Sequence, residues 1–140
     1  MPAGASHGHA MGWQRAENLL VALGIIAVMI ALGQPWWLLL VTFLVFDLSA
    51  LGYAVSQGVG ALSYNLVHNY APPGALVVGW AALQLAAVDA GWLLVIAACW
   101  AFHVAVDRAL GFGLKLGPFT HTHLGAIGKD APSRRSAESS

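Results

Sequence analysis

The distribution of charge along the chain is the feature that most constrains its fold. Between Asn18 and Val106 the only formally charged side chains are Asp47 and Asp89. Across all 140 residues only 9% are charged, whereas soluble domains carry about 25%. A soluble helical domain with this composition would need an apolar outer face as well as an apolar core. We therefore predict an all-α integral membrane protein with the lipid bilayer as its surroundings.

Apolar segments divide the chain into three regions. We expect a polar, disordered N-terminal tail at residues 1–17, a transmembrane bundle at residues 18–116 and a cytoplasmic C-terminal tail at residues 117–140. The bundle would contain about four transmembrane helices, drawn from segments 18–33, 36–54, 59–88 and 91–110. The third helix is expected to be broken at Pro72-Pro73, since neither ring has an N–H to donate. Residues 59–70 would then span the bilayer, re-enter it or lie at its interface.

Positive charge predicts the orientation. Arg15 precedes the first segment, Arg108 and Lys115 flank the last, and the loops between carry no Lys or Arg. The positive-inside rule places both termini in the cytoplasm, which requires an even number of spans. The formal net charge is zero, so no excess of positive charge favours a nucleic-acid partner.

Four ionisable residues lie inside the apolar segments at similar depth. At 1.5 Å per residue, Asp47 and His103 lie roughly 10–12 Å from the inner ends of their helices, His68 roughly 15 Å and Asp107 about 6 Å. An ionisable residue within a span costs about 2.5–3.5 kcal/mol on insertion scales, so its presence is a functional hypothesis. We expect the four to converge in the cytoplasmic half of the bundle.

The last segment carries two distinct faces. Cys99, His103 and Asp107 share one face at i, i+4 and i+8. A row of small residues lies on nearly the opposite face and could pack on a neighbouring helix or on a second subunit of a homo-oligomer. This row consists of Ala97, Ala101, Ala105 and Ala109.

Further polar residues surround this set. Asn65 and Asn69 share a helix face with His68, and we assign them supporting roles. Arg108 is expected to reach the interface or to pair with a carboxylate, and Lys115 to be a solvated anchor. His121 and His123, two residues apart, would fold back under the inner end of the bundle or remain exposed to solvent.

Two functional hypotheses follow from these residues. The first is a metal site in which Asp47, His68, His103 and Asp107 bind zinc, manganese or iron, with His123 as a fifth ligand or a proton-transfer group. Such a centre suits a metal-dependent hydrolase. The second is a module that binds or transports protons, ions or a small solute around the broken third helix. Haem held by His68 and His103, or a purely structural role, completes the alternatives.

Several strings of residues resemble a known family. They are Phe46-Asp47-Leu48-Ser49 with Gly52-Tyr53, Tyr64-Asn65-Leu66-Val67-His68-Asn69-Tyr70, His103 with Asp107-Arg108, Gly111-Phe112-Gly113-Leu114-Lys115 and Thr122-His123-Leu124-Gly125. Together they resemble an uncharacterised bacterial membrane family, domain of unknown function 4260, which implies a multi-pass protein of the inner membrane. A looser resemblance to membrane-bound metal-dependent hydrolases would place their Thr-His motif at Thr122-His123.

Overall fold

The first helix is longer than its apolar segment. In the computed structural model, which describes residues 3–123 and 125–126, helix α1 spans Ala3–Ala31. Residues 3–17, expected to form a disordered tail, are thus helical. The side chain of Arg15 shows what this extension does, because its Nε donates to the carbonyl oxygen of Ala109, 2.9 Å away. The N-terminal half of α1 therefore caps the last turn of the final long helix.

The second apolar segment is not one helix. It forms α2 (Leu38–Val41), α3 (Phe43–Asp47) and the 3₁₀ helix η1 (Leu48–Ala54). Helix η1 packs closely against α4 (Gln57–Val67), and glycines allow the close approach. A Cβ on Gly60 would lie 2.2 Å from Cγ of the Tyr53 ring, and one on Gly52 would lie 2.2 Å from Ser63 Oγ. This close hairpin carries Asp47 at its base.

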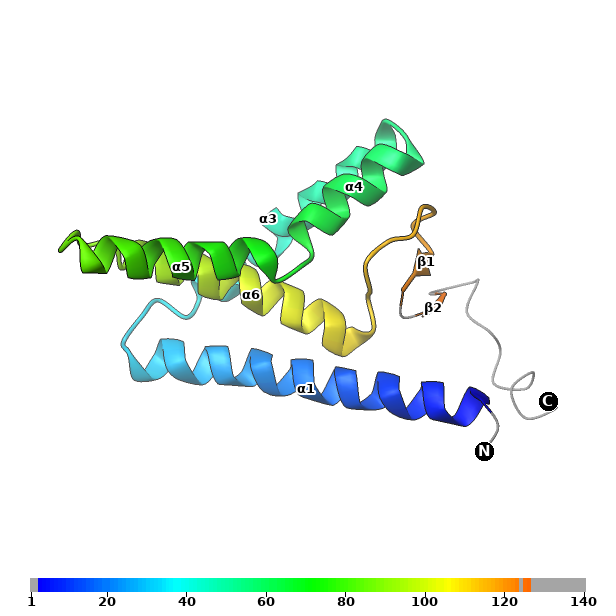
Figure 1. Ribbon diagram of the computed structural model, residues 1–140, viewed down its shortest axis with the longest axis horizontal. Coiled ribbons are helices and arrows are strands. Elements are labelled where there is room, and N and C mark those ends of the chain that lie inside the picture. Colours follow the sequence, from blue (N-terminus) through cyan, green and yellow to red (C-terminus); the bar gives the residue numbers. More distant parts are fainter. Residues whose placement is uncertain (1–2, 124, 127–140) are drawn as a thin grey trace.

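The third apolar segment forms two helices that diverge. Helix α4 ends at Val67 and α5 spans Ala71–Leu85. The interruption falls at residues 68–70 rather than at Pro72-Pro73, and both prolines lie in the first turn of α5. A first turn tolerates proline because its N–H groups have no partner within the helix. Figure 1 shows α5 along the long axis of the molecule and α4 rising obliquely from it.

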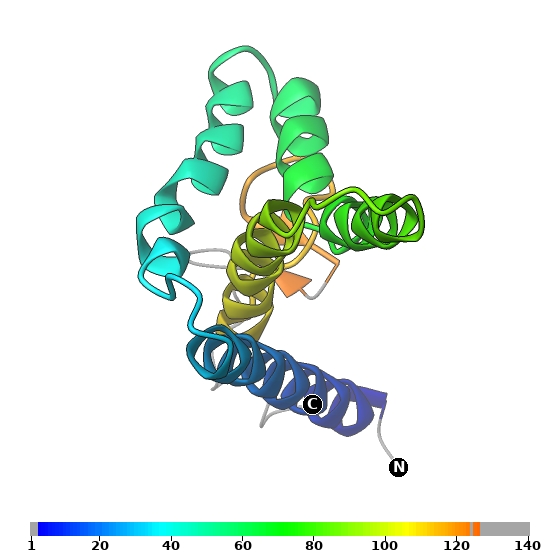
Figure 2. The ribbon, with the colours of Figure 1, turned by 90° about the vertical axis from the view of Figure 1, so that its left-hand side faces the viewer.

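Helix α6 (Trp92–Leu110) is central to the packing. It contacts both α1 and α5, and Figure 2 shows it between them. The core cluster joins it to α1 and α2 through Ala22, Met29, Leu39, Cys99, Phe102 and Ala105. Ala105, a member of the predicted oligomer face, is 0% exposed within this cluster. Part of the alanine row therefore packs inside the chain.

The segment after α6 returns to the bundle. Gly111, with φ of 98°, ends α6 in the left-handed conformation. The chain then forms a short hairpin of β1 (His121–Thr122) and β2 (Gly125–Ala126), with a bridge between Lys115 and Thr122. Residues 117–123, expected in a tail, thus belong to an ordered turn, whereas residues 127–140 of that predicted tail lie outside the described residues.

Two stretches of the described chain are long and apolar enough to cross a membrane. They are His9–Ala31 of α1 and Trp92–Leu110, which is α6. Helices α4 and α5, with 11 and 15 residues, are each shorter than the roughly 20 residues that a 30 Å hydrocarbon core requires. The all-α class is confirmed, and two candidate spans weakly favour a membrane protein.

Candidate metal centre

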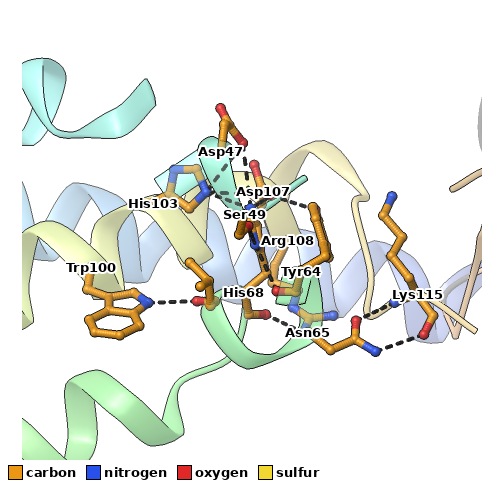
Figure 3. Close-up of polar contacts among 11 residues, drawn as sticks. Asp47, Ser49, Tyr64, Asn65, His68, Trp100, His103, Asp107, Arg108 and Lys115 are labelled. Carbon is orange, nitrogen blue, oxygen red and sulfur yellow. Dashed lines mark hydrogen bonds and ion pairs between the residues drawn. The ribbon is translucent and has the colours of Figure 1, made fainter. Parts of the chain in front are cut away.

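Four side chains from three segments meet beside α6. Asp47 lies at the end of α3, His68 directly follows α4, and His103 and Asp107 lie one turn apart on α6. One ligand atom from each residue lies within 4.8 Å of those of the other three. Figure 3 shows His68, His103 and Asp107 converging below the carboxylate of Asp47.

The distances among these atoms resemble those of a tetrahedral metal site. His68 Nε2 lies 3.6 Å from Asp47 Oδ1 and 3.4 Å from Asp107 Oδ2. His103 Nε2 lies 3.7 and 3.9 Å from the same two oxygens, and the two Nε2 atoms are 2.9 Å apart. Ligands about 2.0–2.1 Å from a tetrahedral zinc ion are about 3.3 Å from one another. Four of the five separations are longer than that value, and the one between the two Nε2 atoms is shorter.

Hydrogen bonds to the other ring nitrogen orient His68. Its Nδ1 lies 3.0 Å from the backbone carbonyl oxygen of Tyr64 and 3.4 Å from Ser49 Oγ. A carbonyl oxygen can only accept, so Nδ1 carries the proton and Nε2 presents its lone pair to the centre. Metal-binding histidines in proteins are commonly oriented through such a bond.

Tyr64 contacts two of the four candidate ligands. Its hydroxyl donates to Asp107 Oδ2 at 3.0 Å. Its ring stacks on that of His68, with centroids 3.6 Å apart and planes 8° apart. Through these contacts and its carbonyl oxygen, Tyr64 fixes the position of a carboxylate and an imidazole.

His103 has a different environment. It is completely buried, and its ring lies against Phe43, with the two centroids 4.5 Å apart. Its Nδ1 has no hydrogen-bond partner among the described residues. His103 Nε2 can carry the proton and donate a hydrogen bond to His68 Nε2, 2.9 Å away, which leaves the buried His103 Nδ1 unprotonated. For His103 Nε2 to bind a metal, its proton would have to move to Nδ1, which has no acceptor among the described residues.

The break between α4 and α5 leaves carbonyl groups that other side chains satisfy. Pro72 has no N–H for the carbonyl of His68, and Arg108 Nη2 donates to that oxygen instead, at 3.1 Å. The N–H of Ala71 is bonded to Asn69 Oδ1, and Trp100 Nε1 donates to the carbonyl of Val67 at 2.6 Å. Two side chains of α6 thereby bond to the carbonyl groups at the end of α4, at the level of the candidate centre.

The two predicted supporting asparagines have structural roles. Asn65 makes two hydrogen bonds with the backbone of Lys115, donating to its oxygen at 2.8 Å and accepting from its N–H at 2.6 Å. Asn69 Nδ2 donates back to the carbonyl of Asn65 at 2.6 Å. Asn65 therefore fixes the returning loop to α4, while Asn69 fixes the break.

The histidines after α6 do not join the cluster. His123 Nδ1 accepts a hydrogen bond from the N–H of Leu114 at 2.8 Å, and its Nε2 lies 3.3 Å from Arg108 Nη1. Burial, followed by the charge of Arg108, lowers the pKa of His123. His121 is exposed, with Nδ1 3.2 Å from Thr120 Oγ1. His123 thus reaches the centre only indirectly, through Arg108, rather than as a fifth ligand.

Lys115 is buried rather than solvated. It is 3% exposed, and its Nζ lies 3.9 Å from the ring centroid of Phe119 and 4.7 Å from that of Tyr64. Burial lowers the pKa of Lys115, whereas the charge of Asp107 raises it. The ammonium group of Lys115 therefore lies close to the ring of Tyr64, whose hydroxyl donates to Asp107.

Three residues of the site carry no role in the sequence-based prediction. Tyr64 had a detectable signal, since it lies four residues before His68 on the same helix face. Ser49 appeared in a family-like string but with no role assigned, and Trp100 had no signal, because their partners are a distant ring nitrogen and a carbonyl left by a break.

Comparison with known proteins identifies the family. No curated protein and no solved structure matches the chain. Residues 11–127 match the family described as Domain of unknown function (DUF4260). This match covers most of the chain and includes every residue of the cluster. The chain therefore belongs to the DUF4260 family.

Proposed function

We propose that this protein is a multi-pass protein of a bacterial inner membrane that binds one divalent transition metal in the cytoplasmic half of its bundle. The outer surface supports the membrane location. Large apolar side chains are exposed along every long helix, among them Leu20 on α1, Val78 on α5 and Ile96 on α6. A bilayer would cover this surface, whereas water would make it prone to aggregation.

The convergence of four ligand atoms carries the metal proposal. Asp47, His68, His103 and Asp107 come from three separate segments and meet within 4.8 Å. Two carboxylates and two neutral imidazoles carry a formal charge of −2, which a divalent cation would neutralise in a region of low dielectric. Mixed nitrogen and oxygen ligands suit zinc, manganese or iron(II).

Hydrolysis is the chemistry that such a centre favours. A divalent ion supplies Lewis acidity and lowers the pKa of a bound water. The chain would supply four groups to hold the ion and a tyrosine to position Asp107, and one candidate ligand, Asp47, has a side chain that is 46% exposed. The opening at Asp47 is where water and substrate would enter.

The geometry lends less support to the other functions. The transport hypothesis relied on backbone groups exposed by the broken helix. Instead, the carbonyls of Val67 and His68 accept hydrogen bonds from Trp100 and Arg108. Haem would need room for its ring between two histidines, yet the Nε2 atoms of His68 and His103 are in direct contact at 2.9 Å.

Elemental analysis of the detergent-purified protein tests the proposal. We expect about one transition-metal ion per chain and loss of that ion in His103→Ala and Asp107→Asn. His121→Ala and Asp89→Asn make the same changes outside the cluster and should retain the metal. Wild-type protein that remains metal-free after incubation with zinc, manganese and iron(II) would overturn the proposal, as would full occupancy in the two cluster variants.

A further inference from the structure

Among the described residues, the candidate centre is open on one flank only. The side chains of His68, His103 and Asp107 are 3%, 0% and 12% exposed, whereas that of Asp47 is 46% exposed. Figure 3 likewise shows Asp47 at the outer edge of the group. A molecule that reaches the centre without unfolding the chain must therefore approach past Asp47.

Exposed apolar side chains precede and follow Asp47 along its segment. Leu44, one turn before Asp47, is 70% exposed, and Leu48 and Leu51 after it are 58% and 67% exposed. Asp47 is the only charged residue in the whole stretch from Leu38 to Ala54. The other polar side chains of this segment, those of Thr42, Ser49 and Tyr53, are uncharged, and their hydroxyl groups already contact other groups of the chain. The exposed border of the opening is therefore predominantly apolar.

The position of Asp47 along its segment limits how deep in the bilayer the opening can lie. Seven residues separate it from the end of η1, which at about 2.0 Å per residue places it roughly 14 Å from that end. The polar headgroup layer occupies only about 5–8 Å on each side of a 30 Å hydrocarbon core. Because η1 pairs with α4, which lies oblique to α5, 14 Å is an upper limit on this depth. In the proposed orientation the opening would thus lie between the headgroups and the upper acyl chains of the inner leaflet.

From the exposed flank, its apolar border and this depth, we infer that the substrate is a membrane lipid that enters laterally past Asp47 and presents a carbonyl or phosphoryl oxygen to the metal. The inference rests on the proposed metal site and specifies its substrate class. For an acyl ester, hydrolysis would add the hydroxyl of water to the acyl carbon, break the bond between that carbon and the ester oxygen, and leave a proton on the released alcohol.

Cobalt-loaded protein in lipid nanodiscs tests lateral entry without requiring turnover. The probes are two hydroxamic acids with the same metal-binding group, acetohydroxamic acid in water and hexadecanoyl hydroxamic acid in the bilayer. Binding is read from the visible absorption of cobalt. After each concentration is corrected for its measured membrane partition, we expect the long-chain probe to bind at least tenfold more tightly.

A matched pair of variants locates the entrance. Leu48→Gln at the border of the opening should weaken the long-chain probe several-fold and leave the cobalt spectrum without probe unchanged. Leu85→Gln makes the same change at a residue that is 92% exposed, at the distant end of α5 (Figure 1), and should leave both probes unaffected.

The outcomes separate the two proposals. Corrected affinities that are equal, or tighter binding of acetohydroxamic acid, would overturn lateral entry and leave the metal site intact. Equal effects of Leu48→Gln and Leu85→Gln would likewise overturn it. A protein that takes up no cobalt would overturn the metal site and, with it, the lipid inference.

Discussion

Single residues in this protein contact several groups of the candidate centre at once. Tyr64 bonds Asp107 through its hydroxyl, His68 Nδ1 through its carbonyl oxygen, and the His68 ring through stacking. Arg108 likewise donates to the carbonyl of His68 and contacts His123. The positions of the candidate ligands therefore depend on neighbours that would not touch a metal themselves.

Removal of the Tyr64 hydroxyl tests this dependence. Tyr64→Phe keeps the ring stack and the carbonyl contact but leaves Asp107 Oδ2 without its donor, so we expect metal affinity to fall about 10–100-fold. Competition against a chelator of known affinity measures the change. Tyr53→Phe removes a hydroxyl that donates to Gly117 instead, at 3.1 Å, and should bind metal as the wild type does. Equal affinities in the two variants would contradict a positioning role for Tyr64.

His123 predicts a pH dependence of stability. Its pKa is lowered in the folded protein by burial and by Arg108, so the unfolded chain binds the proton more readily. The contribution of His123 to the free energy of unfolding is fully present above its unfolded pKa of about 6.5 and is lost as the pH falls below that value. His123→Asn keeps an acceptor for Leu114 N–H and removes the titration. Thermal unfolding from pH 8 to pH 5 should lower the Tm of the wild type more than that of the variant, and parallel curves would contradict this.

At the scale of the elements, the close pairing of η1 with α4 determines where Asp47 lies. Gly60→Ala would place a methyl group against the Tyr53 ring, with the nearest ring carbon 2.2 Å away. We expect overpacking of about 1–3 kcal/mol and a Tm several degrees lower in detergent. Gly58→Ala, on the same helix, meets nothing within 4 Å and should leave the Tm unchanged or raise it slightly, since alanine favours helix. A Gly60→Ala protein as stable as Gly58→Ala would show that the pairing is loose.

How much of these elements the sequence predicts depends on the origin of each feature. The four clustered residues were predicted because an ionisable group in an apolar segment is conspicuous on its own. The interruption of the third segment was predicted at the prolines but occurs three residues earlier, because a first helical turn accepts proline and other side chains satisfy the freed carbonyls. The division of segment 36–54 has one local feature, because the hydroxyl of Thr42, between α2 and α3, donates to the carbonyl of Leu38 at 2.6 Å, a bond that often bends helices. The packing of η1 on α4 and of α2 and α3 on α6 is long-range and was not predicted.

The positions of Lys115 and His123, in the segment after α6, were also beyond what a local pattern of residues predicts. His123 was expected near the candidate ligands and instead lies beside Arg108. Lys115 was expected in solvent and is buried among aromatic rings. Both positions follow from the two hydrogen bonds between Asn65 and the backbone of Lys115. Such a long-range pairing is visible only once the chain is folded.

At the scale of the whole molecule, the turns separate into two groups. Figure 1 shows the α1–α2 and α5–α6 connections at one end and the end of α6 toward the other. Arg15 joins this second end through its bond to Ala109, and Arg108 and Lys115 lie there as well. These three cations, which are those of the described residues, thus lie at one end, as the proposed cytoplasmic orientation of both termini requires.

Two glutamines at opposite ends of the second segment test that orientation. Gln34 lies in the α1–α2 connection and Gln57 begins α4, and both are exposed. In a Cys99→Ala background, we expect Gln34→Cys to react with a membrane-impermeant maleimide in intact cells, because the segment after it runs inward. Gln57→Cys should react only after the inner membrane is opened. Reaction of both from the same side would show that segment 36–54 does not cross the bilayer, and Asp47 would then lose the lipid-facing depth on which the proposed substrate class depends.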